Sequence, residues 1–152
     1  MVFQSRSLGK LEAARKIGEL RKGYMPLGQY RKLFASKLKK DPRGALDVLR
    51  EALRYYGEDP GFLNEAAWIL LTEKGLSGDR ENLRLALELA EKAVRMGGGG
   101  EGSILDTLAL ALFKNGRPAR ALAVQEKALG LMPGSADLRK RLLLYRKALE
   151  RK

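Results

Sequence analysis

Apolar residues recur along most of the chain at intervals of three and four positions, the spacing that places side chains on one face of an α-helix. Gly and Pro fall between these periodic stretches, and β-branched residues are scarce. The pattern predicts an all-α chain without strands, of about eight helices. The expected helices lie near residues 8–22, 26–39, 42–56, 60–74, 80–96, 102–115, 118–131 and 135–150.

Three of the expected helix starts carry capping residues. Asp41 precedes Pro42, Asp59 precedes Pro60, and Ser135 is followed two residues later by an acid. An Asp or Ser side chain accepts hydrogen bonds from the free N–H groups of the first turn, where Pro has no N–H to satisfy. Helix ends are expected at Gly23, Gly57, Gly75, Gly116 and the glycine run at 97–100.

Three segments share one arrangement of alanines. ALDVLREAL at 45–53, ALELAEKAV at 86–94 and ALAVQEKAL at 121–129 each have Ala at their first and eighth positions, and LNEAAWILL at 63–71 matches LDTLALALF at 105–113. A separation of two helical turns places both alanines on one face, where small side chains let a neighbouring helix approach closely. Helix pairs of this kind cannot bury their apolar faces alone, so a stacked solenoid is expected in place of a bundle.

The segment from Gly102 to Ser135 resembles the tetratricopeptide repeat family over the length of one repeat. The matching residues are Leu108 and Ala109 at the family's Leu-Gly pair, Leu112 at its aromatic position, Gly116 at its turn, Ala121 and Ala128 in its second helix, and Pro133 at its closing proline. The segments LNEAAW and LDTLAL also look like the repeats found at the ends of multidomain bacterial proteins.

Two less complete copies precede this segment. The copy from Pro60 keeps Ala67, Leu70, Ala86 and Ala93, but its inter-helix turn holds about seven extra residues. The copy from about Pro26 keeps Ala45 and Ala52, while its first helix departs from the family pattern.

The resemblance implies a single domain, 1–152, built as a right-handed α-solenoid of antiparallel helix pairs. A basic N-terminal helix at 1–25 would precede repeats at 26–59, 60–101 and 102–134, and a capping helix at 135–152 would follow. In that last helix, an apolar stripe at helical spacing should cover the end of the stack. The stripe consists of Leu138, Leu142, Tyr145 and Leu149.

In the family, the first helix of each pair lines a concave groove that holds a peptide or a helix, which implies a protein-binding scaffold or adaptor. Carried over by position, the groove residues are Tyr30, Phe34, Asn64, Trp68, Thr72, Asp106, Leu110 and Lys114. Trp68 is the expected anchor, because tryptophan is enriched at binding hot spots. The alternative is that Trp68 packs between helices. The carboxylate-clamping branch of the family is not expected, because Trp68 and Leu110 replace its asparagines and Asp106 would repel a carboxylate.

The distribution of charge gives a second hypothesis. The formal net charge is +12, with 12 Lys or Arg against three acids in residues 1–43 and seven against two in residues 135–152. A basic excess of this size attracts anionic partners, which indicates RNA, a ribosomal surface or an acidic membrane as the alternative partner. The other interpretation is an ordinary solvated surface. The basic patch consists of Lys10, Arg15, Lys16, Arg21, Lys22, Arg31, Lys32, Lys37, Lys39 and Lys40.

Composition argues against catalysis. The chain has no His and no Cys, which removes the commonest general base, the commonest metal ligand and thiolate chemistry. The segment GGGGEGS at 97–103 lacks the preceding strand and the Gly-Lys-Ser/Thr ending of a phosphate-binding loop. We therefore expect no enzyme, no cofactor and no metal. Without a long apolar run or a secretory signal, the expected location is cytoplasmic, and the oligomeric state is left open.

Overall fold

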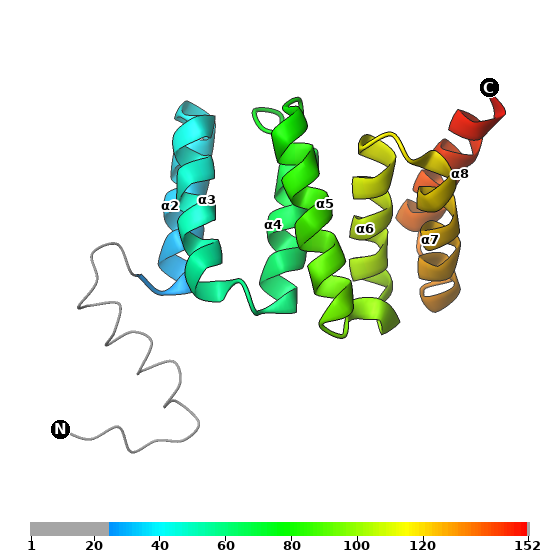
Figure 1. The fold of residues 1–152 in the computed structure, drawn as a ribbon, viewed down its shortest axis with the longest axis horizontal. Coiled ribbons are helices and arrows are strands. Elements are labelled where there is room, and N and C mark those ends of the chain that lie inside the picture. The colour runs from blue at the N-terminus through cyan, green and yellow to red at the C-terminus, as the bar shows by residue number, and fades with distance from the viewer. Residues whose placement is uncertain (1–24, 152) are drawn as a thin grey trace, which may run out of the picture. The chain divides into compact units, whose positions relative to one another are not determined.

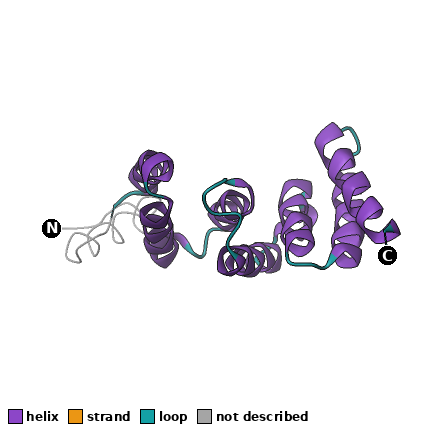
Figure 2. Cartoon of the chain, turned by 90° about the horizontal axis from the view of Figure 1, so that it is seen from above, coloured by secondary structure: helices purple, strands orange, loops and turns teal. Residues whose placement is uncertain are grey.

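The computed structural model describes residues 25–151, in which helices are joined by loops and no strand occurs (Figure 2). These residues form α2 (Leu27–Lys40), α3 (Pro42–Tyr56), α4 (Pro60–Thr72), α5 (Arg80–Arg95), a short 3₁₀ helix η1 (Gly98–Gly100), α6 (Gly102–Lys114), α7 (Pro118–Leu131) and α8 (Ala136–Glu150). The all-α prediction is confirmed, and the expected helices from residue 26 onward all occur within two residues of their predicted limits. The helix expected at 8–22 lies outside the described residues.

The predicted capping residues are confirmed. At the start of α4, the side chain of Asp59 accepts hydrogen bonds from the backbone N–H groups of Gly61 and Phe62, at 2.9 and 3.3 Å. Asp41 and Ser135 cap α3 and α8 in the same way, each through one N–H group of the first turn. These bonds satisfy donors that a helix cannot satisfy itself, so the chain sequence sets the helix starts locally.

Gly116 ends α6 as predicted. Its φ of 80° lies in the left-handed region, which side chains with a Cβ rarely adopt, and its N–H donates to the carbonyl of Phe113. α3 ends directly before Gly57, also as predicted. α4 ends at Thr72, ahead of the expected Gly75, and the long turn that follows is held by a buried side chain, Leu76.

The chain divides into two compact units, Met1–Tyr56 and Gly57–Lys152. In the first unit, α2 packs against α3 around the buried ring of Tyr30. This ring stacks on Tyr55 and meets Tyr56 edge-on, with ring centroids 6.4 and 6.2 Å apart, and its hydroxyl donates to Glu51 at 2.9 Å. An aromatic cluster thus holds this helix pair together.

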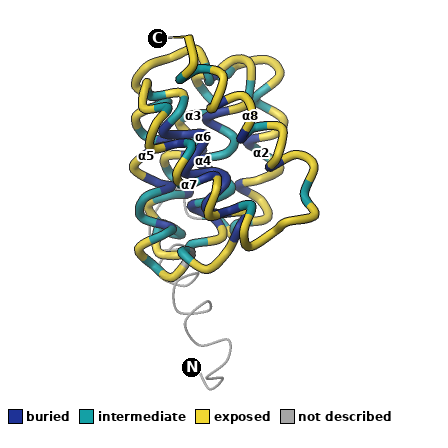
Figure 3. Tube along the Cα trace, turned by 90° about the vertical axis from the view of Figure 1, so that its right-hand side faces the viewer, coloured by how far each residue is buried: buried dark blue, intermediate teal, exposed yellow. Residues whose placement is uncertain are grey.

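In the second unit, consecutive helices pack against each other from α4 to α8 (Figure 1). Alternate helices also touch, because α6 contacts both α4 and α8. These three helices form one layer, and α6 lies in its middle. Every residue from Ile104 to Leu112 of α6 is buried, which makes it the centre of this unit's core (Figure 3).

The repeated alanines lie where helices meet. All six, Ala45, Ala52, Ala86, Ala93, Ala121 and Ala128, are buried. The start of α6 also lies close to α7 and its end: a Cβ added at Gly102 would lie 2.6 Å from the Met132 side chain and 3.1 Å from the carbonyl oxygen of Ala128. Small residues at these positions therefore permit the close helix packing that their spacing predicted.

The predicted apolar stripe of the last helix is largely confirmed. Leu138, Leu142 and Tyr145 are buried where α8 packs on α7 and α6, and Leu149 is partly buried. The opposite side of α8 carries the exposed Leu143 and Leu144. α8 therefore covers the apolar side of α6 and α7 with one face only.

Replacing either buried alanine of α7 with leucine, Ala121→Leu or Ala128→Leu, should overpack the helix interface. We expect a loss of about 1–3 kcal/mol in the free energy of unfolding, measured by urea denaturation. Ala123→Leu on the exposed side of α7 is the matched control and should change stability by less than about 0.5 kcal/mol. Equal effects at all three positions would contradict the assigned packing.

Candidate binding site

The second unit contains six of the expected groove residues, and they have different surroundings. Asn64 and Trp68 on α4 are partly buried, while Thr72 and Lys114 are exposed. Asp106 and Leu110 on α6 are buried, with only 5% and 7% of their surface exposed. The expectation that Asp106 and Leu110 face an open groove is therefore wrong, because α4 and α8 contact α6 on either side.

The carboxylate of Asp106 is held by side chains from two other helices. Arg141 on α8 binds it with two hydrogen bonds, Nε to Oδ1 at 2.8 Å and Nη2 to Oδ2 at 2.7 Å. The buried Gln125 on α7 donates from Nε2 to Oδ1 at 2.9 Å and to the carbonyl of Leu138 at 3.0 Å. A bidentate arginine fixes both the distance and the plane of its carboxylate partner. This polar cluster therefore ties α6, α7 and α8 together.

The same guanidinium also contacts Trp68. Cζ of Arg141 lies 5.2 Å from the centroid of the Trp68 ring, within the range of a cation–π interaction. Arg141 thus links α8 both to α6, through Asp106, and to α4, through Trp68. The ring of Trp68 thus contacts a side chain of a neighbouring helix, and the residue is partly buried.

The environment of this cluster changes two pKa values. Burial lowers the pKa of Arg141, but the hydrogen bonds and charge of Asp106 outweigh burial, so the pKa rises above its usual value. Burial raises the pKa of Tyr145, and the negative charge of Asp106 raises it further. The Tyr145 hydroxyl has no hydrogen-bond partner within residues 25–151. Both shifts favour the protonated side chain in the folded protein.

The remaining two expected groove residues belong to the first unit. Tyr30 and Phe34 are buried, with 2% and 8% of their surface exposed. The expectation that they line an open groove is therefore wrong. Tyr30 instead forms the aromatic core between α2 and α3, with Tyr55 and Tyr56.

The basic patch is seen only in part. Lys10, Arg15, Lys16, Arg21 and Lys22 lie outside the described residues. On α2, Arg31, Lys32, Lys39 and Lys40 are exposed and Lys37 is partly buried. Three of these lysines occupy the last turn of α2, where positive charge interacts favourably with the helix dipole. The charge on α2 therefore has a structural role besides any role in binding.

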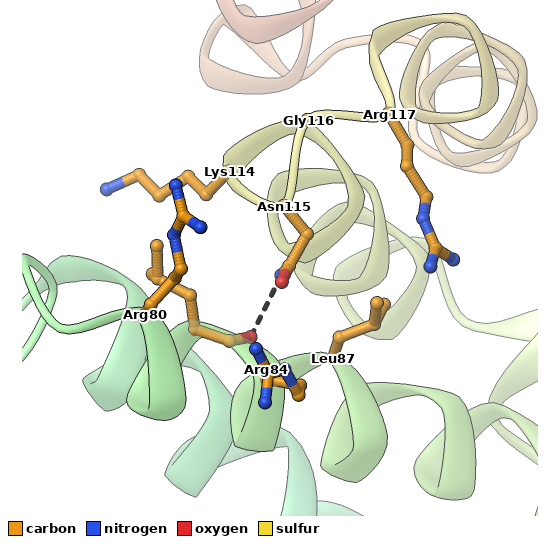
Figure 4. Close-up of a pocket in the computed structure, with 8 residues that line it drawn as sticks. Arg80, Arg84, Leu87, Lys114, Asn115, Gly116 and Arg117 are labelled. Carbon is orange, nitrogen blue, oxygen red and sulfur yellow. Dashed lines mark hydrogen bonds between the residues drawn. The ribbon is translucent and has the colours of Figure 1, made fainter.

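A second concentration of positive charge was not predicted from the sequence. A pocket of about 560 Å³ is lined by Arg80 and Arg84 on α5, Lys114 at the end of α6 and Arg117 in the turn that follows (Figure 4). Its other lining residues are Leu83, Leu87, Asn115 and Gly116. The four-residue spacing of Arg80 and Arg84 indicates a shared helix face, but the sequence does not show that this face meets the turn.

Asn115 joins the two sides of this pocket. Its Nδ2 donates to the carbonyl of Leu83 on α5 at 2.9 Å (Figure 4). It also donates to the carbonyl of Ala111 on α6 at 2.7 Å. Lys114 is also held, because its Nζ donates to the carbonyl of Leu71 at the end of α4. The pocket is therefore built on hydrogen bonds that connect three helices.

Comparison with known proteins adds no family assignment: no protein-family model matches the chain, and no curated protein matches it. Within residues 25–151, no three His, Cys, Asp or Glu side chains are grouped so that they could hold a metal ion. None of the described helices is long and apolar enough to cross a membrane.

Arg141→Met should leave the buried carboxylate of Asp106 with Gln125 as its remaining described side-chain partner. Hydrogen bonds to charged groups contribute about 1.5–3 kcal/mol, and we expect a loss of this size in the free energy of unfolding. The matched control is Arg146→Met, an exposed arginine on the same helix, with an expected change below about 0.5 kcal/mol. Similar urea midpoints for both variants would contradict the role of the ion pair.

Tyr145→Phe should change how stability depends on pH. The pKa of Tyr145 is higher in the folded protein than its unfolded value of about 10. The folded state therefore favours the protonated hydroxyl, and the contribution of this preference to the free energy of unfolding is complete below pH ~10. The contribution is lost as pH rises towards the folded-state pKa. Urea denaturation between pH 8 and 11 should show a steeper loss for the natural protein than for Tyr145→Phe. At pH 7 the variant should be equally stable or slightly more stable, because the hydroxyl it removes has no described partner. A parallel pH dependence would contradict this role.

Proposed function

We propose that this protein is a non-catalytic scaffold of the tetratricopeptide repeat type, a right-handed solenoid that binds another protein. Support comes from the helix pairs, the buried alanines at their repeated spacing and the last helix packed on one apolar face. The observation that carries the proposal is the partly exposed Trp68, whose ring is paired with Arg141 on the layer of α4, α6 and α8.

Trp and Arg are the residue types most enriched at binding hot spots. In this layer Arg141 is positioned from one side by the carboxylate of Asp106 and contacts the ring of Trp68. A side chain that is ordered before binding loses less conformational entropy when a partner arrives. The pair therefore offers a preorganised contact for an extended peptide or a helix.

The partner would lie along the exposed residues of this layer. Thr72 lies one turn after Trp68 and donates its hydroxyl hydrogen bond to the Trp68 carbonyl, and Lys114 reaches from α6 to the end of α4. Asp106 and Leu110 would act beneath this surface, as supports for the residues that make contact.

The second candidate function is binding of an anionic partner through the basic patch. The exposed Arg31, Lys32, Lys39 and Lys40 on α2 favour it, because they present positive charge from one helix. RNA, a ribosomal surface and an acidic membrane share the required negative charge. Binding of this kind should weaken steeply as salt increases, which separates it from binding through Trp68.

Trp68→Ala should weaken binding of a protein partner by about 2 kcal/mol or more, because an aromatic anchor concentrates binding energy. Partners are recovered with the immobilised protein after nuclease treatment, at about 50 and 200 mM salt. Affinity is then measured with the purified partner. Because the chain has a single tryptophan, its fluorescence should change on binding and reports directly on this surface.

Leu131→Ala, which removes an exposed apolar side chain on α7, outside the layer of α4, α6 and α8, should leave that binding unchanged. Trp68→Phe keeps a ring beneath Arg141 and should have an intermediate affinity. Circular dichroism checks that each variant is folded. The opposite result is loss of binding in a variant with Lys37, Lys39 and Lys40 changed to Glu, with binding retained in Trp68→Ala. The basic patch would then be the surface that binds the partner, and the proposal would fail.

A further inference from the structure

The pocket between α5 and the turn after α6 gathers positive charge without internal compensation. Three of its lining side chains are guanidinium groups, and no Asp or Glu lines it. None of Arg80, Arg84 and Arg117 forms an ion pair with a residue in the described part of the chain. This differs from Arg141, whose charge is matched by Asp106. Like charges held together attract an anion that neutralises them.

The framework that holds these charges is ordered by backbone geometry and hydrogen bonds. The left-handed conformation of Gly116 turns the chain between Lys114 and Arg117, and the Arg117 N–H donates to the carbonyl of Leu112 at 2.9 Å. Asn115 ties the turn to Leu83 on α5. The Lys114 ammonium donates one hydrogen bond to a carbonyl, whereas the three guanidinium groups form no ion pair with a described residue and can donate to a ligand. Arginine binds carboxylates and phosphates with paired, directed hydrogen bonds.

The floor of the pocket limits the kind of ligand. It includes the partly buried Leu83 and the buried Leu87, and no aromatic ring lines it. Nucleic-acid bases bind protein surfaces largely by stacking on aromatic rings, which this pocket does not offer. An aliphatic side chain fits such a floor, and the volume of about 560 Å³ is within the range of ligand-binding pockets. The pattern is a positive rim around an apolar floor.

We propose that this pocket binds an acidic segment of a partner protein. One aliphatic side chain of the segment would contact Leu83 and Leu87, and neighbouring carboxylates would bind the three arginines. The surface belongs to α5 and the turn after α6, and Trp68 is not among its residues. Lys114, which lies on the partner-facing layer, also lines the pocket, so the two surfaces adjoin at that residue. The pocket is a second binding site, and it rests on the proposed function only in taking the partner to be a protein.

The test uses a fluorescein-labelled peptide of aspartates and glutamates with one central leucine, and fluorescence anisotropy at about 50 mM salt. Arg84→Glu combined with Arg117→Glu should weaken binding at least about tenfold, because two of the three guanidinium charges are reversed. The control combines Arg43→Glu with Arg50→Glu, exposed arginines that do not line the pocket. It makes the same change in net charge and should weaken binding less than about threefold. A peptide with serine in place of leucine should bind the natural protein several-fold more weakly.

Two outcomes of the measurements with these double variants would overturn this proposal. An equal loss in both double variants would show attraction to the total charge of the protein alone. The second outcome is that a labelled single-stranded RNA binds more tightly than the peptide and loses its binding in the Arg84→Glu, Arg117→Glu double variant. That result would assign the pocket to phosphates. If the double variant fails to fold, Arg84→Gln with Arg117→Gln removes the charges and should weaken binding in the same direction.

Trp68→Ala separates this site from the proposed function. The variant should bind the acidic peptide as the natural protein does, because Trp68 does not line the pocket. Loss of peptide binding in Trp68→Ala would overturn the pocket assignment. A different result would be that Trp68→Ala leaves the affinity for a partner protein unchanged, while the arginine variants bind the peptide more weakly. That result would contradict the proposed function of the Trp68 surface and support the pocket as a binding site.

Discussion

The buried carboxylate of Asp106 is the constraint on which the second unit depends. A carboxylate with 5% of its surface exposed is costly unless its charge and hydrogen-bonding capacity are matched. Here Arg141 supplies two donors from α8 and Gln125 supplies one from α7. These bonds require both helices to lie at one position along α6. The apolar stripe of α8 favours burial against α6 and α7, and the ion pair selects the register in which that burial occurs.

This constraint also explains the state of Trp68. If Arg141 moved away, the buried carboxylate of Asp106 would be left without a counter-charge, which is costly. The ion pair therefore keeps the guanidinium beside the Trp68 ring. The family resemblance places Asp106 among residues that contact a ligand, whereas the structure places it below the surface. Its part in binding would be indirect, through the position of the arginine. A polar residue at a ligand-contacting position can therefore support its neighbours from within the fold.

The sequence predicted what depends on local physics. Helix starts follow from Asp41, Asp59 and Ser135, because a cap acts on N–H groups one turn away. The face of each second helix follows from its two alanines, because helical periodicity alone sets that face. The Asp106–Arg141 pair was not predicted, since these residues are 35 positions apart and meet only when α8 packs on α6.

The pocket of α5 shows the same limit in another way. Its arginines are ordinary surface residues in the sequence, and their relation appears only when the Gly116 turn meets α5. Within this unit, the charge of Arg141 is neutralised by its ion pair with Asp106. Arg80, Arg84 and Arg117 have no acidic partner among the described residues. A high net charge alone does not separate these two uses of arginine. The arrangement of acids around each guanidinium separates them. It also indicates where an anionic ligand meets uncompensated positive charge and is therefore bound most favourably.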